Sequence, residues 1–318
     1  MDLLHRSARS WPVDFRAGVG AMLDTVDAEF AGKATDDKPS ASYLVPLQQC
    51  IFRFLCKAFV GADPSADWLV DNFGFTILDI WLAWQILPTQ KVGLVQPLEE
   101  LLIHSFPLPS FLIWPGYYLL YRFVEKHGAE AVAYAETQHG IGKKDAINNI
   151  LFVLGFNAFG GFSVFLPFLV AKVGDAADAT GLRPRLRRRR DFVLRSHGGT
   201  AYQVSKGEVL CGYQPLAMRD PEVFDRPEEF VPERFLGDDG AKLLQHLFWS
   251  NGPETAQPAP GNKQCAAKEV VVDTACMLLA EMFRRYDDFV VEGTSFTKLV
   301  KREPSPSLSP AAAAGAQQ

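Results

Sequence analysis

The sequence predicts a mainly helical protein with a small β element. Apolar residues recur at helical spacing through most of the chain, and short alternating segments are confined to residues 191–210. The totals fit a globular protein of 318 residues, 48% of them hydrophobic and 22% charged. The 24 phenylalanines favour an apolar pocket or a membrane-facing patch. A net charge of −5 argues against nucleic-acid binding, which needs a broad basic face.

The first half of the chain is expected to be helical, with runs that end at glycine or proline. Gly61 ends the second run, Pro88 the third and Pro107 the fourth. The last run is the most apolar, and the one before it carries charges on one face. The expected helices cover residues 13–30, 43–60, 75–87, 92–106, 117–140 and 143–171.

The C-terminal part has a different character. Residues 183–190 (RPRLRRRR) are a basic run, which we interpret as a solvated face because it stands alone in an acidic protein. Paired glycines and alternating segments in 191–210 predict short strands and hairpins. Residues 213–240 form a Pro- and acid-rich meander, and a further amphipathic helix is expected over 266–286. The low-complexity tail 305–318 is expected to be disordered.

The segment Ile150–Ala171 contains no charged residue and is long enough to span a bilayer. Asn157, a glycine pair and Pro167 interrupt it, so we favour a buried helix of a globular protein over a membrane span. Asn157 is then a single amide in an apolar helix, and a buried amide needs a partner. That partner is either a neighbouring helix or the oxygen of a ligand.

The five cysteines are scattered, at positions 50, 56, 211, 265 and 276. None forms a close C-x-x-C pair or joins histidines at the spacing of a zinc site. Their odd number and scatter indicate a reducing compartment. The N-terminal segment MDLLHRSARSWPVDF lacks the apolar core of a secretory signal, and we find no targeting peptide in the chain.

Cys265 ends a loop rich in Gly, Pro and Asn, FWSNGPETAQPAPGNKQC. Because a helix is expected to follow directly, its sulfur would lie near free backbone N–H groups and the positive end of the helix dipole. Both stabilise a thiolate. A thiolate held rigidly on an apolar surface suits haem iron. The alternative is a buried structural cysteine at the start of a helix.

These residues together resemble the plant branch of the cytochrome P-450 superfamily that metabolises fatty-acid hydroperoxides. SNGPETAQPAPGNKQCAAK (250–268) resembles its haem-thiolate loop, with an insertion before the cysteine and the sequence N-K-Q-C at 262–265. FNAFGG (156–161) resembles its central helix, which here lacks the acid–Thr pair of monooxygenases. PERF (232–235) resembles the superfamily's meander motif. The branch contains allene oxide synthases, hydroperoxide lyases and divinyl ether synthases, and residues 81–106 look most like a lyase.

The resemblance implies a haem-thiolate fold over residues 1–304. The central helix would cover 143–171, the meander 213–240 and the haem-cysteine loop 248–268. Haem b would be held by Cys265 as the axial ligand of its iron.

The resemblance also implies roles for further side chains. Asn157 would hydrogen-bond the hydroperoxide or steer the radical, and Lys263 would lie beside a haem propionate. Phe156, Phe159 and Phe162 would line an apolar pocket, or else belong to the core. The implied reaction cleaves a fatty-acid hydroperoxide to a short aldehyde and an oxo acid in oxylipin biosynthesis. The expected substrate is a 13-hydroperoxide of linolenic or linoleic acid.

The implied setting is the chloroplast, at the envelope or the thylakoid, with peripheral membrane association. The reaction needs neither O2 nor a reductase, and no nucleic acid is expected as a partner. Two alternatives stay open within the family: an allene oxide synthase, and an inactive truncated product. A haem-free membrane protein built around residues 150–171 is the alternative from a different class.

The chain departs from the family pattern in two places. It is shorter at the N-terminus, and the E-x-x-R of the superfamily's K helix is missing between Leu186 and Asp191. The E-x-x-R at Glu281–Arg284 follows the cysteine and cannot replace it. Arg234 of the meander is therefore expected to lack its usual ionic partners, and the fold is expected to be incomplete.

Overall fold

The computed structural model describes residues 10–91, 93, 95–105, 109–174, 185–187, 192–195, 201–204, 209–211, 214–250, 252–257, 259, 262, 264–265 and 267–302. Lys263 and the tail predicted to be disordered lie outside the described residues. The chain divides into two compact units, which are described separately. Unit 1 contains residues 1–175 and 269–318, and unit 2 contains residues 176–268.

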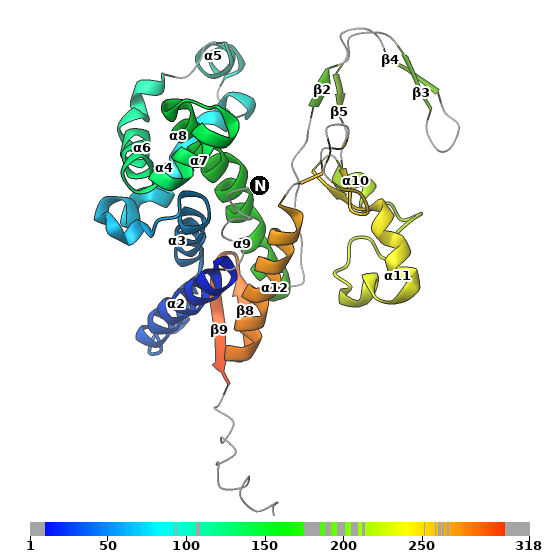
Figure 1. Cartoon of the computed structure of the whole chain (residues 1–318). Coiled ribbons are helices and arrows are strands. Elements are labelled where there is room, and N and C mark those ends of the chain that lie inside the picture. The colour runs from blue at the N-terminus through cyan, green and yellow to red at the C-terminus, as the bar shows by residue number, and fades with distance from the viewer. Residues whose placement is uncertain are drawn as a thin grey trace, which may run out of the picture. The chain divides into compact units, whose positions relative to one another are not determined.

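Unit 1 is a bundle of helices with a small sheet (Figure 1). The predicted apolar run at 143–171 forms one continuous helical segment of three parts, α8, η6 and α9, the middle one a π-helix. The helices of unit 1 are α2 (Trp11–Gly32), α3 (Leu44–Leu55), α4 (Trp68–Ile86), α5 (Gln96–Glu99), α6 (Trp114–His127), α7 (Ala129–His139), α8 (Lys143–Phe152), α9 (Gly160–Gly174) and α12 (Lys268–Arg285). The π-helical stretches are η1 (Cys56–Val60), η4 (Glu100–His104) and η6 (Val153–Phe159).

Three expected helices have different bounds. Helix α4 begins at Trp68 because the Asp67 carboxylate caps it. This carboxylate accepts hydrogen bonds from the backbone N–H groups of Leu69 and Val70. The run 117–140 is two helices, interrupted at Gly128. In place of a helix over 92–106 the described residues show only α5 and η4.

An antiparallel sheet that the sequence analysis missed closes unit 1. Strands β8 (Tyr286–Glu292) and β9 (Ser295–Lys301) form a hairpin directly after α12, and the short strand β1 (Ala41–Ser42) pairs with β9. The turn contains Gly293, whose φ of 59° is the left-handed conformation that glycine adopts without strain. The hairpin places Phe296 against Tyr43 in the core, with ring centroids 5.2 Å apart.

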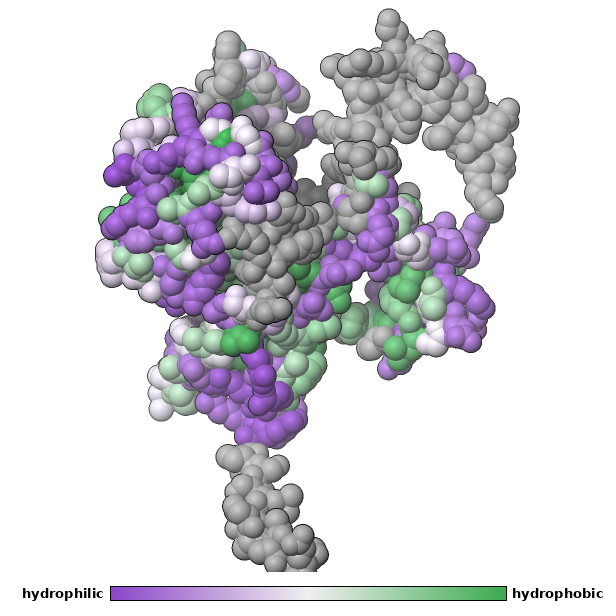
Figure 2. Space-filling view, viewed as in Figure 1, coloured by the Kyte–Doolittle hydropathy of each residue, from purple (hydrophilic) through white to green (hydrophobic). Residues whose placement is uncertain are grey.

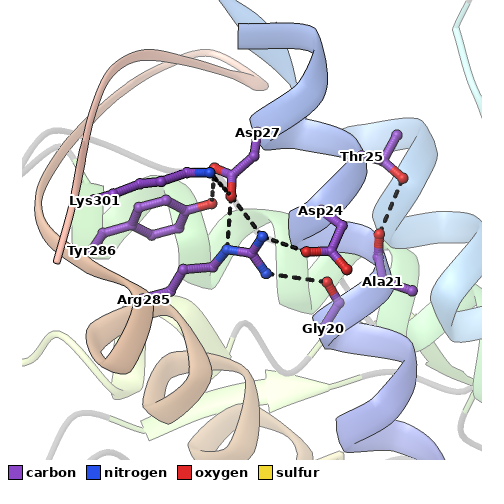
Figure 3. A network of polar contacts seen from close by, with 8 residues as sticks. All are labelled: Gly20, Ala21, Asp24, Thr25, Asp27, Arg285, Tyr286 and Lys301. Carbon is purple, nitrogen blue, oxygen red and sulfur yellow. Dashed lines mark hydrogen bonds and ion pairs between the residues drawn. The ribbon is translucent and has the colours of Figure 1, made fainter. Parts of the chain in front are cut away.

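A polar network fastens α2 to this hairpin (Figure 3). Asp27, only 6% exposed, accepts hydrogen bonds from Arg285 Nε and Tyr286 Oη at 2.8 Å and pairs with Lys301 Nζ at 2.8 Å. Arg285 also pairs with Asp24 and donates to the Gly20 carbonyl at 3.4 Å. A buried carboxylate is retained here because three donors satisfy it.

Unit 2 contains small hairpins and short helices. The strands predicted within 191–210 are confirmed for β3 (Phe192–Arg195), which pairs with β4 (Ala201–Val204). A further strand, β2 (Arg185–Arg187), lies in the basic run, where no strand was predicted, and pairs with β5 (Val209–Cys211). Two helices, α10 (Gln214–Ala217) and α11 (Gly237–Leu243), flank the meander, and β6 (Phe248–Trp249) pairs with β7 (Gly252–Pro253). Hydrophobic surface gathers around α11 (Figure 2), where Phe230 and Leu236 are exposed.

Candidate functional site

Asn157 lies in η6, the π-helical stretch between α8 and α9. A π-helix has wider turns than an α-helix and occurs frequently at functional sites. The Asn157 side chain is exposed and forms no hydrogen bond with any residue that the structure describes. The helix–helix hydrogen bond considered from the sequence is therefore not made with the described residues of unit 1, and among these residues the amide is available to a ligand.

Glycines on either side of Asn157 set how this helix packs. A Cβ at Gly155 would lie 2.9 Å from Trp81 Cζ3, so the close approach of α4 requires glycine there. A Cβ at Gly160 would lie 3.2 Å from Leu82 Cδ1, also on α4, whereas nothing lies within 4 Å of a Cβ at Gly161. Open space near the amide is therefore found at Gly161.

The three candidate pocket phenylalanines lie in different environments. Phe156 is 41% exposed and stacks on Phe152, with ring centroids 5.2 Å apart. Phe159 and Phe162 are buried, and Phe162 contacts Phe54 edge to face. The assignment of these rings to a pocket stays a prediction, and Phe156 is the one whose ring is available.

Phe156 belongs to a face of the long helix that the sequence analysis did not single out. Phe152, Phe156, Val164 and Phe168 follow one another at multiples of four residues, and their exposed fractions are 46%, 41%, 61% and 43%. Residues four apart are neighbours on a helix surface. The wider π-helical turn at Val153–Phe159 takes up one residue, so these four-residue steps stay on one side of the segment. The exposed amide of Asn157 therefore lies beside an uncovered apolar stripe, a pattern that the spacing of the aromatic residues could have revealed.

Cys265 lies on a loop held by the β6–β7 hairpin. Its N–H donates to the Trp249 carbonyl at 3.1 Å, and its carbonyl accepts from the N–H of Lys268, the first residue of α12, at 3.2 Å. Ser250 and Gln264 form a β-bridge beside it. A Cβ at Gly252 would lie 2.5 Å from Gln264 N, so only glycine lets the hairpin approach the loop this closely. The predicted position of Cys265 just before a helix is confirmed, and its role as a haem ligand stays a prediction.

The Cys265 thiol differs from the buried thiols of unit 1. Burial raises the pKa of Cys50 to about 12 and that of Cys56 well above its usual value, so both remain neutral core residues. Cys265 is free and half-buried, in a loop rather than in a helical core. A free, half-buried cysteine on a hydrogen-bonded loop is suited to bind a metal from one side, as an axial haem ligand does.

Arg234 organises the meander. Its guanidinium donates to the backbone carbonyls of Asp225, Arg226 and Glu229, the last two at 2.7 and 3.1 Å. Arg226 has a positive φ of 45°, a conformation uncommon in non-glycine residues, within the segment that Arg234 binds. Within the described residues the guanidinium is thus occupied by carbonyls rather than by carboxylates.

The candidate residues belong to both units. Asn157 and the three phenylalanines lie in unit 1, Cys265 lies in unit 2, and Lys263 is outside the described residues. Among the described residues no group of three His, Cys, Asp or Glu side chains is arranged to hold a metal ion directly. The free thiol of Cys265, in unit 2, is a donor that fits haem iron.

The helical segment Lys143–Val173 is long and apolar enough to cross a membrane, with a mean hydropathy of 1.8. Of the most apolar stretch of 18 residues in this segment, 44% is buried within the protein. Tyr43 donates a hydrogen bond to the carbonyl of Pro167 at 3.2 Å, which ties this segment to the core of unit 1. Such a helix is found in the cores of soluble proteins and in membranes alike.

Comparisons with known proteins give extensive matches, although no protein-family model matches the chain. A protein of Arabidopsis thaliana named "Probable inactive linolenate hydroperoxide lyase" is 39% identical over 95% of this chain and 88% of its own length. The chloroplastic fatty acid hydroperoxide lyase of Solanum lycopersicum is 39% identical over 94% of the chain and 71% of its own length. The chloroplastic allene oxide synthase of Arabidopsis thaliana is 35% identical over 89% of the chain, which spans 61% of that protein.

A mainly helical chain with a loop-held cysteine before a helix has the features of a haem-thiolate protein. The matches are specific to one branch of that class. The chain belongs to the hydroperoxide lyase and allene oxide synthase branch of the cytochrome P-450 superfamily, as the N-K-Q-C loop predicted.

Proposed function

We propose that the chain is a fatty-acid hydroperoxide lyase that cleaves a polyunsaturated fatty-acid hydroperoxide into a short aldehyde and an oxo acid. The observation that carries this proposal is the free, half-buried Cys265 on its hydrogen-bonded loop, in a chain related to lyases. Relatives named as linolenate hydroperoxide lyases support a 13-hydroperoxide of linolenic or linoleic acid as the substrate. The chloroplastic names of relatives support a chloroplast location.

In this proposal Cys265 holds haem b through its sulfur and Lys263 lies beside a propionate. When bound, a thiolate-ligated haem supplies the iron that breaks the O–O bond. The Asn157 amide donates a hydrogen bond to the hydroperoxide oxygens and orients them. Phe156 and the apolar stripe beside it hold the acyl chain and exclude water. No reductase or O2 is needed, because the substrate brings its own O–O bond.

The proposal is tested on the full chain reconstituted with haem. The ferric protein should show a Soret band typical of thiolate ligation, and Cys265→Ser should abolish it. Substrate turnover should be followed as loss of the conjugated-diene absorbance of the hydroperoxide. Aldehyde and oxo acid products identify a lyase, whereas ketols formed from an allene oxide identify an allene oxide synthase. A Cys265→Ser protein with an unchanged spectrum would contradict the haem assignment.

An inactive product is the second candidate, because a related protein is named as probably inactive. The match to that relative runs over 346 residues, more than the 318 of this chain, so the relative carries segments that this chain lacks. This supports the proposal that the K-helix region is missing. Hydrophobic surface left uncovered around α11 would promote aggregation. Low haem occupancy and an aggregated chain would favour this candidate, and a monodisperse chain with full occupancy would exclude it.

A further inference from the structure

The insertion before Cys265 is attached to the first turn of α12 by an ion pair. Glu254 Oε1 lies 3.0 Å from Lys268 Nζ, and the same ammonium group donates to the Glu254 backbone carbonyl at 3.0 Å. The exposed fractions of the Lys268 and Glu254 side chains are 18% and 23%. Among the ion pairs that the structure describes, this is the one with both partners less than a quarter exposed. Partial burial makes such a charge-assisted contact stronger than a surface pair.

The same hairpin holds the residues on both sides of the ion pair. The Gln264 amide donates to the carbonyls of Pro253 and Glu254, at 2.6 and 3.1 Å. Lys268 N–H bonds to the Cys265 carbonyl, so the cysteine lies between two attachment points. The sulfur's position is therefore set from both sides by residues 253–254 of the insertion.

We infer that Glu254 and Lys268 are a positioning pair that fixes Cys265 for iron ligation. The inference deepens the proposed function and rests on it for the role of the sulfur. An axial ligand must present its sulfur at one place, and a loop rich in glycine and proline lacks side-chain packing to hold it there. The ion pair supplies that attachment. Neither residue touches the metal, so both act through the backbone of Cys265.

Two measurements on the full chain test the pair. In the haem-free protein, the rate at which iodoacetamide alkylates Cys265 reports how firmly the loop is held. It is measured by mass spectrometry on the peptide that contains Cys265. In the reconstituted protein, the ferrous carbon monoxide spectrum separates thiolate ligation from ligation by a neutral thiol. Circular dichroism confirms that each variant is folded.

Two variants each remove one charge of the Glu254–Lys268 pair with little change in side-chain shape. Glu254→Gln and Lys268→Met should each raise the alkylation rate about tenfold, because a charge-assisted contact is lost, and should each reduce the thiolate fraction. Lys268→Arg keeps the cation and should behave like the wild type. Asp239→Asn breaks the pair with Lys242, whose side chains are 96% and 72% exposed, and is the matched control in the same unit. It should change neither readout.

The outcomes separate this inference from the proposed function. If both charge-removing variants retain the wild-type alkylation rate and thiolate fraction, the positioning role is wrong. If Lys268→Met has an effect and Glu254→Gln has none, the lysine acts by its own charge and the pair is again refuted. If the wild type shows no thiolate spectrum but both variants are alkylated faster, the proposed function fails and the attachment of the loop stands.

Discussion

Asp27 should make a large contribution to the stability of unit 1, and the variant that tests this is Asp27→Asn. The substitution keeps the size of the side chain but removes the charge shared by Arg285 and Lys301 (Figure 3). Removing one partner of a fully buried ion pair costs about 3–5 kcal/mol. Solvent reaches both cations here, since their side chains are 27% and 61% exposed. We therefore expect a loss of about 2 kcal/mol in the free energy of unfolding.

The same carboxylate should make stability depend on pH. Burial raises the pKa of Asp27, but hydrogen bonds from Lys301, Tyr286 and Arg285 outweigh it, so the pKa lies below its ordinary value of 3.8. A carboxyl group whose pKa is lowered by folding stabilises the protein above the unfolded pKa. That contribution disappears as the pH falls through the folded pKa. The difference between wild type and Asp27→Asn should thus be full at neutral pH and shrink below a pH of about 4.

Urea unfolding followed by circular dichroism, repeated from pH 7 to pH 3, measures both effects. Asp24→Asn is the control, because Asp24 pairs with the same Arg285 but its side chain is 71% exposed. It should change the free energy of unfolding by at most about 0.5 kcal/mol. The reasoning is refuted if Asp27→Asn also stays within that margin at pH 7, or if its deficit is the same in acid as at neutral pH.

Four further substitutions test the long helix and its support. Asn157→Ala should lower turnover of the hydroperoxide roughly ten- to a hundredfold, by loss of one hydrogen bond to the reacting oxygens, and leave the haem spectrum unchanged. Unchanged turnover would refute a role of Asn157 in the reaction. Gly155→Ala should cost about 1–3 kcal/mol in unfolding free energy because its methyl group would meet Trp81. Gly161→Ala, with open space around it, should instead be neutral or slightly stabilising, and equal effects at the two glycines would be inconsistent with the packing. Tyr43→Phe should lower the free energy of unfolding by about 1 kcal/mol, because it removes a buried hydroxyl that lies 3.2 Å from two backbone carbonyls. Thermal unfolding measures this loss. An unchanged midpoint would mean that these hydrogen bonds do not contribute to stability.

Sequence patterns were informative where helical periodicity extends over several turns. The run at 143–171, the first helix and the helix after Cys265 were predicted close to their observed bounds, because apolar residues recur there at helical spacing. The position of Cys265 before a helix followed from the same signals. The strands within 191–210 were predicted from paired glycines.

Other features depend on contacts that no local pattern encodes. The β8–β9 hairpin starts in the residue after α12, so the change from helical to alternating spacing was easily missed. Helix α4 begins as early as Trp68 because the Asp67 side chain caps it. This start depends on a single side chain before the apolar run, and the periodicity of apolar residues does not show it. The pairing of Glu254 with Lys268 joins residues far apart in the chain, and spacing does not predict it.

The π-helical stretch Val153–Phe159 makes the placement of Asn157 depend on residue count as well as on residue type. A π-turn amounts to one residue inserted into an α-helix, and each α-helical residue turns the chain by about 100°. Deleting one residue, such as Ala158, while keeping Asn157 would restore regular α-helix. The narrower turns would take up the missing residue and keep α8 and α9 in their relative orientation, but the side chains inside the stretch would turn relative to both helices. The amide and the stripe on α9 would then point in different directions although every functional side chain was still present. Gains and losses of single residues in this stretch are therefore as informative about a relative's activity as the identity of the amide itself.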